Sequence, residues 1–154
     1  MSAEKKIAEL GLHLPPAPKP MGVYKPIVIV ENMAYLSGHG PVRDDESLSS
    51  GRVGEDFDLE GGYAEARQTG LALLATLREA LGSLNQVNRI VKTLGLVNST
   101  DDFTQQPQVI NGCSELFAEI FGEEIGIGAR SAVATNVLPG NIPVEIEMIV
   151  EIEI

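Results

Sequence analysis

Apolar and polar positions alternate most regularly near the carboxyl end of the chain. In residues 144–154 every second residue is apolar, and four glutamates occupy positions between them, namely Glu145, Glu147, Glu151 and Glu153. Successive side chains of a strand point to opposite faces of a sheet. The segment therefore predicts a strand with one buried face and one largely acidic face.

The segment before this strand predicts a turn and a second strand. Leu138-Pro139-Gly140-Asn141 is typical of a type II turn, because proline presets φ at the second position and glycine accepts the positive φ of the third. Another strand pattern begins at Ala129 and includes Arg130. We therefore expect a hairpin that carries one arginine and several carboxylates.

Residues 61–81 have the spacing of an amphipathic helix. Apolar residues recur three and four positions apart, and this spacing places Glu65 and Thr69 on the opposite, polar side. Asp58 can cap the amino end through its carboxylate, and Gly82 can end the helix.

A second helix is predicted over residues 104–121. Pro107 is tolerated in a first turn, and Gly122 provides the stop. Cys113 falls on the apolar stripe of this helix, which favours a small buried side chain over a reactive thiol.

The first twenty residues predict an attachment to the main domain. Residues 2–10 can form a short helix that begins at Ser2 and ends at Gly11. Residues 15–20 contain four prolines and predict an extended strap over the surface, because proline fixes φ and has no backbone donor. A ligand for a PxxP-binding partner is the alternative. We divide the chain into a helix and strap at 1–20 and one domain at 21–154.

The remaining strand patterns complete a two-layer α+β domain. Residues 27–30 and 34–37 suit a hairpin, residues 43–58 a polar loop, and residues 89–97 a further strand. Two helices with one apolar stripe each can cover one face of a single mixed sheet. The acidic face must then meet solvent or be buried by oligomerisation.

Composition and charge exclude several classes of partner. The chain has 154 residues, 44% of them hydrophobic, and no apolar run approaches the ~20 residues that a membrane helix needs. A net charge of −11 argues against nucleic acid, whose phosphates bind lysine and arginine. One cysteine and the absence of a secretory signal pattern favour the cytoplasm.

Most familiar reaction chemistry has no support in the sequence. Neither His13 nor His39 has a second histidine or a cysteine at ligand spacing, so we expect no metal site. No glycine-rich phosphate loop follows a strand, so nucleotide binding has no support. Arg130 is different, because its guanidinium lies in an apolar strand and needs an anionic partner. That partner is either a glutamate of the adjacent strand or the carboxylate of a ligand.

Several motifs occur in the order of a known family. Arg130-Ser131 is followed by Leu138-Pro139 and by Glu145, fifteen positions after the arginine in a Val-Glu-Ile-Glu strand. Upstream are Gly22-Val23-Tyr24, the segment Tyr35-Leu36-Ser37-Gly38-His39-Gly40-Pro41, Ile90-Val91-Lys92-Thr93 and Asp102-Phe103. From about Tyr24 to its end, the chain resembles the YjgF/RidA family, also called L-PSP endoribonuclease-like or reactive intermediate deaminase proteins.

The resemblance implies a chorismate-mutase-like fold, a homotrimer and a ligand cleft at each of three subunit interfaces. It implies that Arg130 binds the substrate carboxylate and that Glu145 relays a proton of the catalytic water. Tyr24 would line the cleft from the neighbouring subunit, beside Ser37 and Gly38. Backbone groups near Ser131 and Ala132 would orient the water, and Asn111 matches a family asparagine on the second helix.

Two positions depart from the family pattern. Ala132 replaces a cysteine and His39 a glutamine; the histidine is either a titratable group in the cleft or a turn residue. The resemblance implies a cofactor-free deaminase that converts imino acids such as 2-aminoacrylate to 2-keto acids and ammonia. A non-catalytic trimer that binds small carboxylic acids is the alternative. An endoribonuclease is disfavoured by the net charge.

Overall fold

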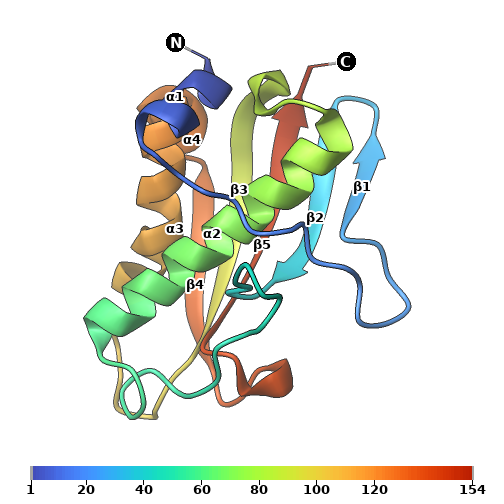
Figure 1. Cartoon of the computed structure of the whole chain (residues 1–154). Helices are drawn as coiled ribbons and strands as arrows, with labels where there is room; N and C mark the ends of the chain where they lie inside the picture. Colours follow the sequence, from blue (N-terminus) through green and yellow to red (C-terminus); the bar gives the residue numbers. More distant parts are fainter. Residues whose placement is uncertain (1, 154) are drawn as a thin grey trace.

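A five-stranded mixed sheet, covered on one face by two long helices, organises the structure, a computed structural model that describes residues 2–153 (Figure 1). The strand order is β1-β2-β5-β3-β4, with β3 and β4 parallel and the other pairs antiparallel. The strands are β1 Ile27–Val30, β2 Met33–His39, β3 Val87–Asn98, β4 Ala129–Thr135 and β5 Val144–Ile152. The predicted two-layer α+β architecture is confirmed. Ile154, the last apolar position of the predicted strand, lies outside the described residues.

The two long helices begin and end where their capping residues predict. Helix α2, Leu59–Leu81, starts at Asp58, whose side chain accepts a hydrogen bond from the Gly61 amide at 2.7 Å, and stops at Gly82 with φ of 81°. Helix α3, Gln106–Phe121, has its proline in the first turn and stops at Gly122. Their apolar stripes meet the sheet and form the core. Cys113 is fully buried there, and burial raises the pKa of its thiol to about 12.

The predicted hairpin of β4 and β5 is wrong. Both strands flank the turn at residues 138–141, but β3 lies between them. A strand–helix–strand unit returns its second strand parallel to its first, and β3, α3 and β4 form such a unit. Since β4 takes the outer edge of β3, β5 pairs with the inner edge and also with β2.

The polar side of α2 is also covered, contrary to the prediction for Glu65 and Thr69. These residues are 6% and 0% exposed, and the loop after β2 covers Glu65. Arg43 of that loop donates from Nη2 to Glu65 Oε1 at 2.8 Å, and Gln68 donates from Nε2 to the carbonyl of Val42 at 2.7 Å. The loop is thus attached to α2 by side-chain contacts that helical periodicity does not reveal.

The amino-terminal segment packs on the helix layer. The short helix α1, Ala3–Glu9, is capped by Ser2 and buries Ala3 and Ile7. Residues 12–20 have neither helix nor strand, and the chain here crosses α2 on its way to β1 (Figure 1). The predicted helix capped by Ser2 is confirmed.

The other face of the sheet has no covering layer among residues 2–153. Glu145, Glu147 and Glu151 of β5 point to this face, because the alternate residues of the strand are buried under the helices. Apolar side chains share the face and are 44–47% exposed at Val28, Tyr35 and Val133. We refer to it as the open face. No helix within residues 2–153 is long and apolar enough to cross a membrane.

Candidate functional site

Two separate hollows contain most of the predicted site residues. The larger, about 720 Å³, is lined by Tyr24, Ser37, Gly38, His39 and Glu145 among others, and we call it the acidic cleft. The smaller, about 290 Å³, lies between β4 and α3, is lined by Arg130 and Asn111, and is called the arginine pocket. A single chain therefore does not bring the arginine and the glutamate together.

The arginine pocket holds Arg130 by neutral groups of α3. Arg130 donates from Nη1 to Asn111 Oδ1 at 2.7 Å and to Ser114 Oγ at 3.2 Å. Asn111 and Ser114 are three residues apart and hence lie on one side of the helix. These contacts leave Nη2 and Nε without a hydrogen-bond acceptor among residues 2–153.

Arg130 has no carboxylate partner within the described chain. No ion pair involves its guanidinium, and the strand next to β4 is β3, which contains no acidic residue. Glu115 lines the pocket, but its Oε2 accepts a hydrogen bond from the hydroxyl of Tyr63 at 2.6 Å. The alternative that Arg130 forms an ion pair with a glutamate of the adjacent strand is therefore wrong.

In the acidic cleft, Glu145 lies against the backbone of β2. A Cβ atom added to Gly38 would lie 2.8 Å from Glu145 Cδ, so a larger residue there would displace this carboxylate. Glu145 is half-buried, and burial, followed by the neighbouring charge of Glu147, raises the pKa of its carboxyl group. A raised pKa suits a group that must both accept and return a proton near neutral pH.

Ser37 fixes the segment that carries Tyr24. Its hydroxyl donates to the carbonyl of Lys25 at 2.5 Å, and its amide donates to the carbonyl of Pro26 at 2.9 Å. Tyr24 is about half exposed at the cleft, and its hydroxyl accepts a hydrogen bond from the Met21 amide at 3.3 Å. The serine therefore acts on the cleft by positioning the tyrosine segment.

His39 lines the acidic cleft, but most of its side chain is buried and hydrogen-bonded to the body of the domain. Its side chain is 4% exposed, with Nδ1 2.6 Å from the carbonyl of Ser37 and Nε2 2.8 Å from Oγ1 of Thr76 on α2. Burial lowers the pKa of the imidazole, and the Ser37 carbonyl opposes this effect. The neutral ring donates from Nδ1, accepts at Nε2, and fixes the end of β2 at the wall of the cleft.

Ser131 and Ala132 continue β4 after the arginine but line neither hollow. Ser131 is exposed, and its Oγ lies 3.1 Å from Lys92 Nζ. Ala132 is half-buried against the core, in register with Gly95 of β3. The cysteine-to-alanine departure therefore falls beside the core in one chain.

Strand register places Arg130 and Glu145 on opposite faces of the sheet. Arg130 is in register with Thr93, which is in register with Met148, and both of these are buried under the helices. Glu145 is in register with Leu96, and Leu96 with Val133 on the open face. No rotamer change brings the two side chains together within one chain.

Sequence reasoning missed several residues around the two hollows. Ser114 was detectable, because it lies one helical turn after Asn111 and so shares its side. Leu48, Glu147, Ile142 and four strap residues also line the acidic cleft, and no local pattern indicates this. Within residues 2–153 there is no group of three or more side chains suited to hold a metal ion.

Comparison with known proteins gives consistent matches over nearly the whole chain. The family model described as "YjgF/chorismate_mutase-like, putative endoribonuclease" matches residues 4–152. A Trypanosoma cruzi relative named Protein TCP17 is 36% identical over 146 residues, which cover 95% of this chain and 91% of the relative.

Solved structures agree with the fold. The crystal structure of a putative endoribonuclease from Shewanella oneidensis is 29% identical, with a TM-score of 0.93 over 99% of this chain and 100% of that one. The crystal structure of RidA from the Antarctic bacterium Psychrobacter sp. PAMC 21119 is 31% identical, with a TM-score of 0.63 over 88% of this chain and 94% of that one. The chorismate-mutase-like fold expected from the sequence is confirmed.

Proposed function

Because this chain belongs to the YjgF/RidA family, we propose that it is a cofactor-free deaminase that hydrolyses small reactive imino acids. The products are a 2-keto acid and ammonia, and 2-aminoacrylate, after tautomerisation to its imine, is a representative substrate. The observation that carries the proposal is the guanidinium of Arg130, which is held by neutral groups and has no carboxylate partner in the described chain.

The free edge of this guanidinium fits a substrate carboxylate. Nη1 is occupied by Asn111 and Ser114, whereas Nε and Nη2 remain as a parallel pair of donors. Such a pair matches the two oxygens of a carboxylate in a bidentate contact, which is stronger and more directional than a contact with an ammonium group. Asn111 and Ser114 then hold the fork in position for the ligand.

A complete site requires a second subunit. The acidic cleft is lined by the carboxylates of Glu46, Glu145 and Glu147 and by the cation Lys19, so it does not favour a substrate carboxylate. The arginine pocket has the cation but lacks Glu145. We propose a homotrimer in which the open face is buried and the arginine pocket of one subunit meets the acidic cleft of the next.

In the proposed reaction, water adds to the carbon of the C=N bond while Glu145 accepts a proton from it. Backbone groups near Ser131 and Ala132 orient the water. Glu145 passes this proton to the nitrogen, which gives a carbinolamine. The hydroxyl proton of the carbinolamine then moves by way of Glu145 to the amino group, the C–N bond breaks, and ammonia leaves a keto group. Tyr24 and the small volume at Gly38 shape the cleft around the reacting carbon.

The test measures ammonia release from an imino acid generated in situ by an amino-acid oxidase. We expect the protein to accelerate release above spontaneous hydrolysis. Arg130→Lys should impair turnover nearly as much as Arg130→Ala, because lysine keeps the charge and loses the fork. Loss of a charged hydrogen-bond partner costs about 2–5 kcal/mol, so each variant should fall by at least roughly thirtyfold.

Arg67 provides the matched control. It pairs with Glu119 across α2 and α3 at 3.3 Å and lines neither hollow, so Arg67→Ala should keep wild-type turnover. Titration of each protein with pyruvate distinguishes catalysis from binding alone. Pyruvate binding that depends on Arg130, without ammonia release, would identify the protein as a non-catalytic binder. Unchanged affinity for pyruvate in both Arg130 variants would exclude the proposed role of Arg130.

A further inference from the structure

The amino-terminal strap forms one wall of the acidic cleft. Pro16, Pro18, Lys19 and Pro20 line the cleft, together with Val42, Leu48 and Ile142 from the loops around it. Apart from the lysine, these side chains are apolar. The carboxylate of Glu145 and the backbone of Gly38 contribute a polar end to the same cleft.

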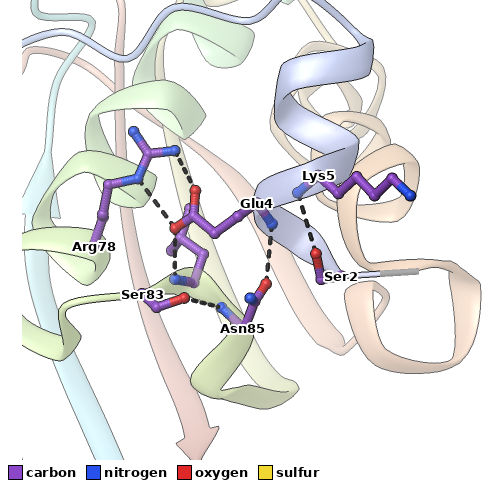
Figure 2. A network of polar contacts seen from close by, with 7 residues as sticks. Ser2, Glu4, Lys5, Arg78, Ser83 and Asn85 are labelled. Carbon is purple, nitrogen blue, oxygen red and sulfur yellow. Dashed lines mark hydrogen bonds and ion pairs between the residues drawn. The ribbon is translucent and has the colours of Figure 1, made fainter.

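The strap is attached firmly at its amino-terminal side (Figure 2). The carboxylate of Glu4 on α1 accepts hydrogen bonds from Arg78 Nη2 at 2.7 Å and from the Leu84 amide at 2.9 Å. The Glu4 amide donates to Asn85 Oδ1 at 3.1 Å. Ile7 lies in the core and Pro15 is buried, so the helix and the first strap residue are both anchored.

Prolines make this wall stiff and poor in hydrogen-bond donors. Four of the six residues at positions 15–20 are prolines, which fix φ and lack a backbone N–H. A segment of this kind acts as a semi-rigid spacer. A wall that is already ordered loses little conformational entropy when a ligand packs against it.

The size of the cleft exceeds the needs of a two- or three-carbon substrate. Its volume of about 720 Å³ falls in the range of about 300–1,000 Å³ that accommodates drug-sized ligands. We propose that the strap is a specificity-determining wall that selects imino acids with a bulky apolar side chain over 2-aminoacrylate. This inference rests on the proposed function, because it places the reacting carbon beside Glu145 and the side chain against the strap.

The experiment compares the affinities of product analogues that differ in size. Calorimetric titration with 4-methyl-2-oxopentanoate and with pyruvate should show at least about tenfold tighter binding of the larger acid, since even one methylene in an apolar pocket is worth about tenfold or more. In Pro16→Ser/Pro18→Ser, which removes two rings from the wall, this preference should fall by about tenfold while pyruvate affinity is unchanged.

Leu48→Trp provides a second, independent variant, because it fills the cleft from the loop side. It should also remove the preference and leave pyruvate binding intact. Leu10→Trp is the matched control, since Leu10 is 39% exposed, close to the 41% of Leu48, and does not line the cleft. It should keep the wild-type preference.

The possible failures are distinguishable. Equal wild-type affinity for the two acids, or a preference that survives in both cleft variants, would overturn the role of the strap and leave the deaminase proposal standing. No affinity of the wild-type protein for either acid, together with no acceleration of ammonia release, would remove the proposed function and the strap inference with it.

Discussion

The separation of Arg130 from Glu145 predicts that two inactive variants restore each other's activity. In each chain these side chains point to opposite faces of the sheet, so in the proposed trimer a working site would take its arginine from one subunit and its glutamate from the next. Arg130→Ala and Glu145→Gln should each form an inactive trimer. Mixed trimers of the two variants should contain intact sites. A Glu145→Gln chain still supplies Arg130, and an Arg130→Ala chain next to it still supplies Glu145.

The expected recovery follows from random assembly in a closed ring. In an equal mixture, half of the chains supply an intact arginine, and half of their neighbours supply an intact glutamate. About a quarter of the sites are then complete. If both side chains came from the same subunit, no site would be complete, because every chain carries one defect.

The assay is ammonia release from an imino acid after the two variants are unfolded and refolded together. Differently tagged chains allow native mass spectrometry to verify that mixed trimers form. An equal mixture of wild type with the Arg130→Ala/Glu145→Gln double variant gives the control. That mixture should retain about a quarter of wild-type activity if sites are shared between subunits and about one half if they are not. The shared site would be refuted if mixed trimers form without recovering activity and the control mixture retains about one half of wild-type activity.

Three other predictions follow from the described features. The pKa of Glu145 is raised in the folded chain, so ionisation of its carboxyl group opposes folding, and the stability of the wild type should fall as pH rises through that pKa. Glu145→Gln should lack this pH dependence. The melting temperature of the variant relative to that of the wild type should therefore rise with pH before levelling off. Light scattering should give three times the chain mass of 16.4 kDa, and Val133→Asp on the open face should produce smaller species. A chain with net charge −11 should bind single-stranded RNA negligibly at about 150 mM salt, and cleavage that requires Arg130 would contradict this.

Local signals predicted the helices and strands well, because each depends on a few neighbouring residues. The cap at Asp58 and the stop at Gly82 lie where the sequence places them, since a carboxylate satisfies free amides and glycine accepts positive φ. Periodicity identified the faces of β5 correctly. It did not identify the neighbours of β5, because alternation fixes which side of a strand is buried and leaves its partners open.

The site was only partly predictable for the same reason. The partner of Arg130 depends on how α3 crosses β4, and the burial of Glu65 depends on a loop whose Arg43 lies 22 residues earlier in the chain. His39 became a buried hydrogen-bonding residue because Thr76 of α2 lies beneath it. The strap was recognised from its prolines, but its place in the wall of the cleft is a property of packing between distant segments.

The position of β5 has a consequence for biosynthesis. It is the last of the five strands in chain order, yet it lies at the centre of the sheet between β2 and β3. Until β5 is available, those two strands expose unpaired edges, and exposed edges are templates for aggregation. A nascent chain on the ribosome can therefore form its helices early but cannot close its sheet until the final strand has emerged. Stalled or prematurely terminated chains that lack β5 should be substrates for chaperones and proteases.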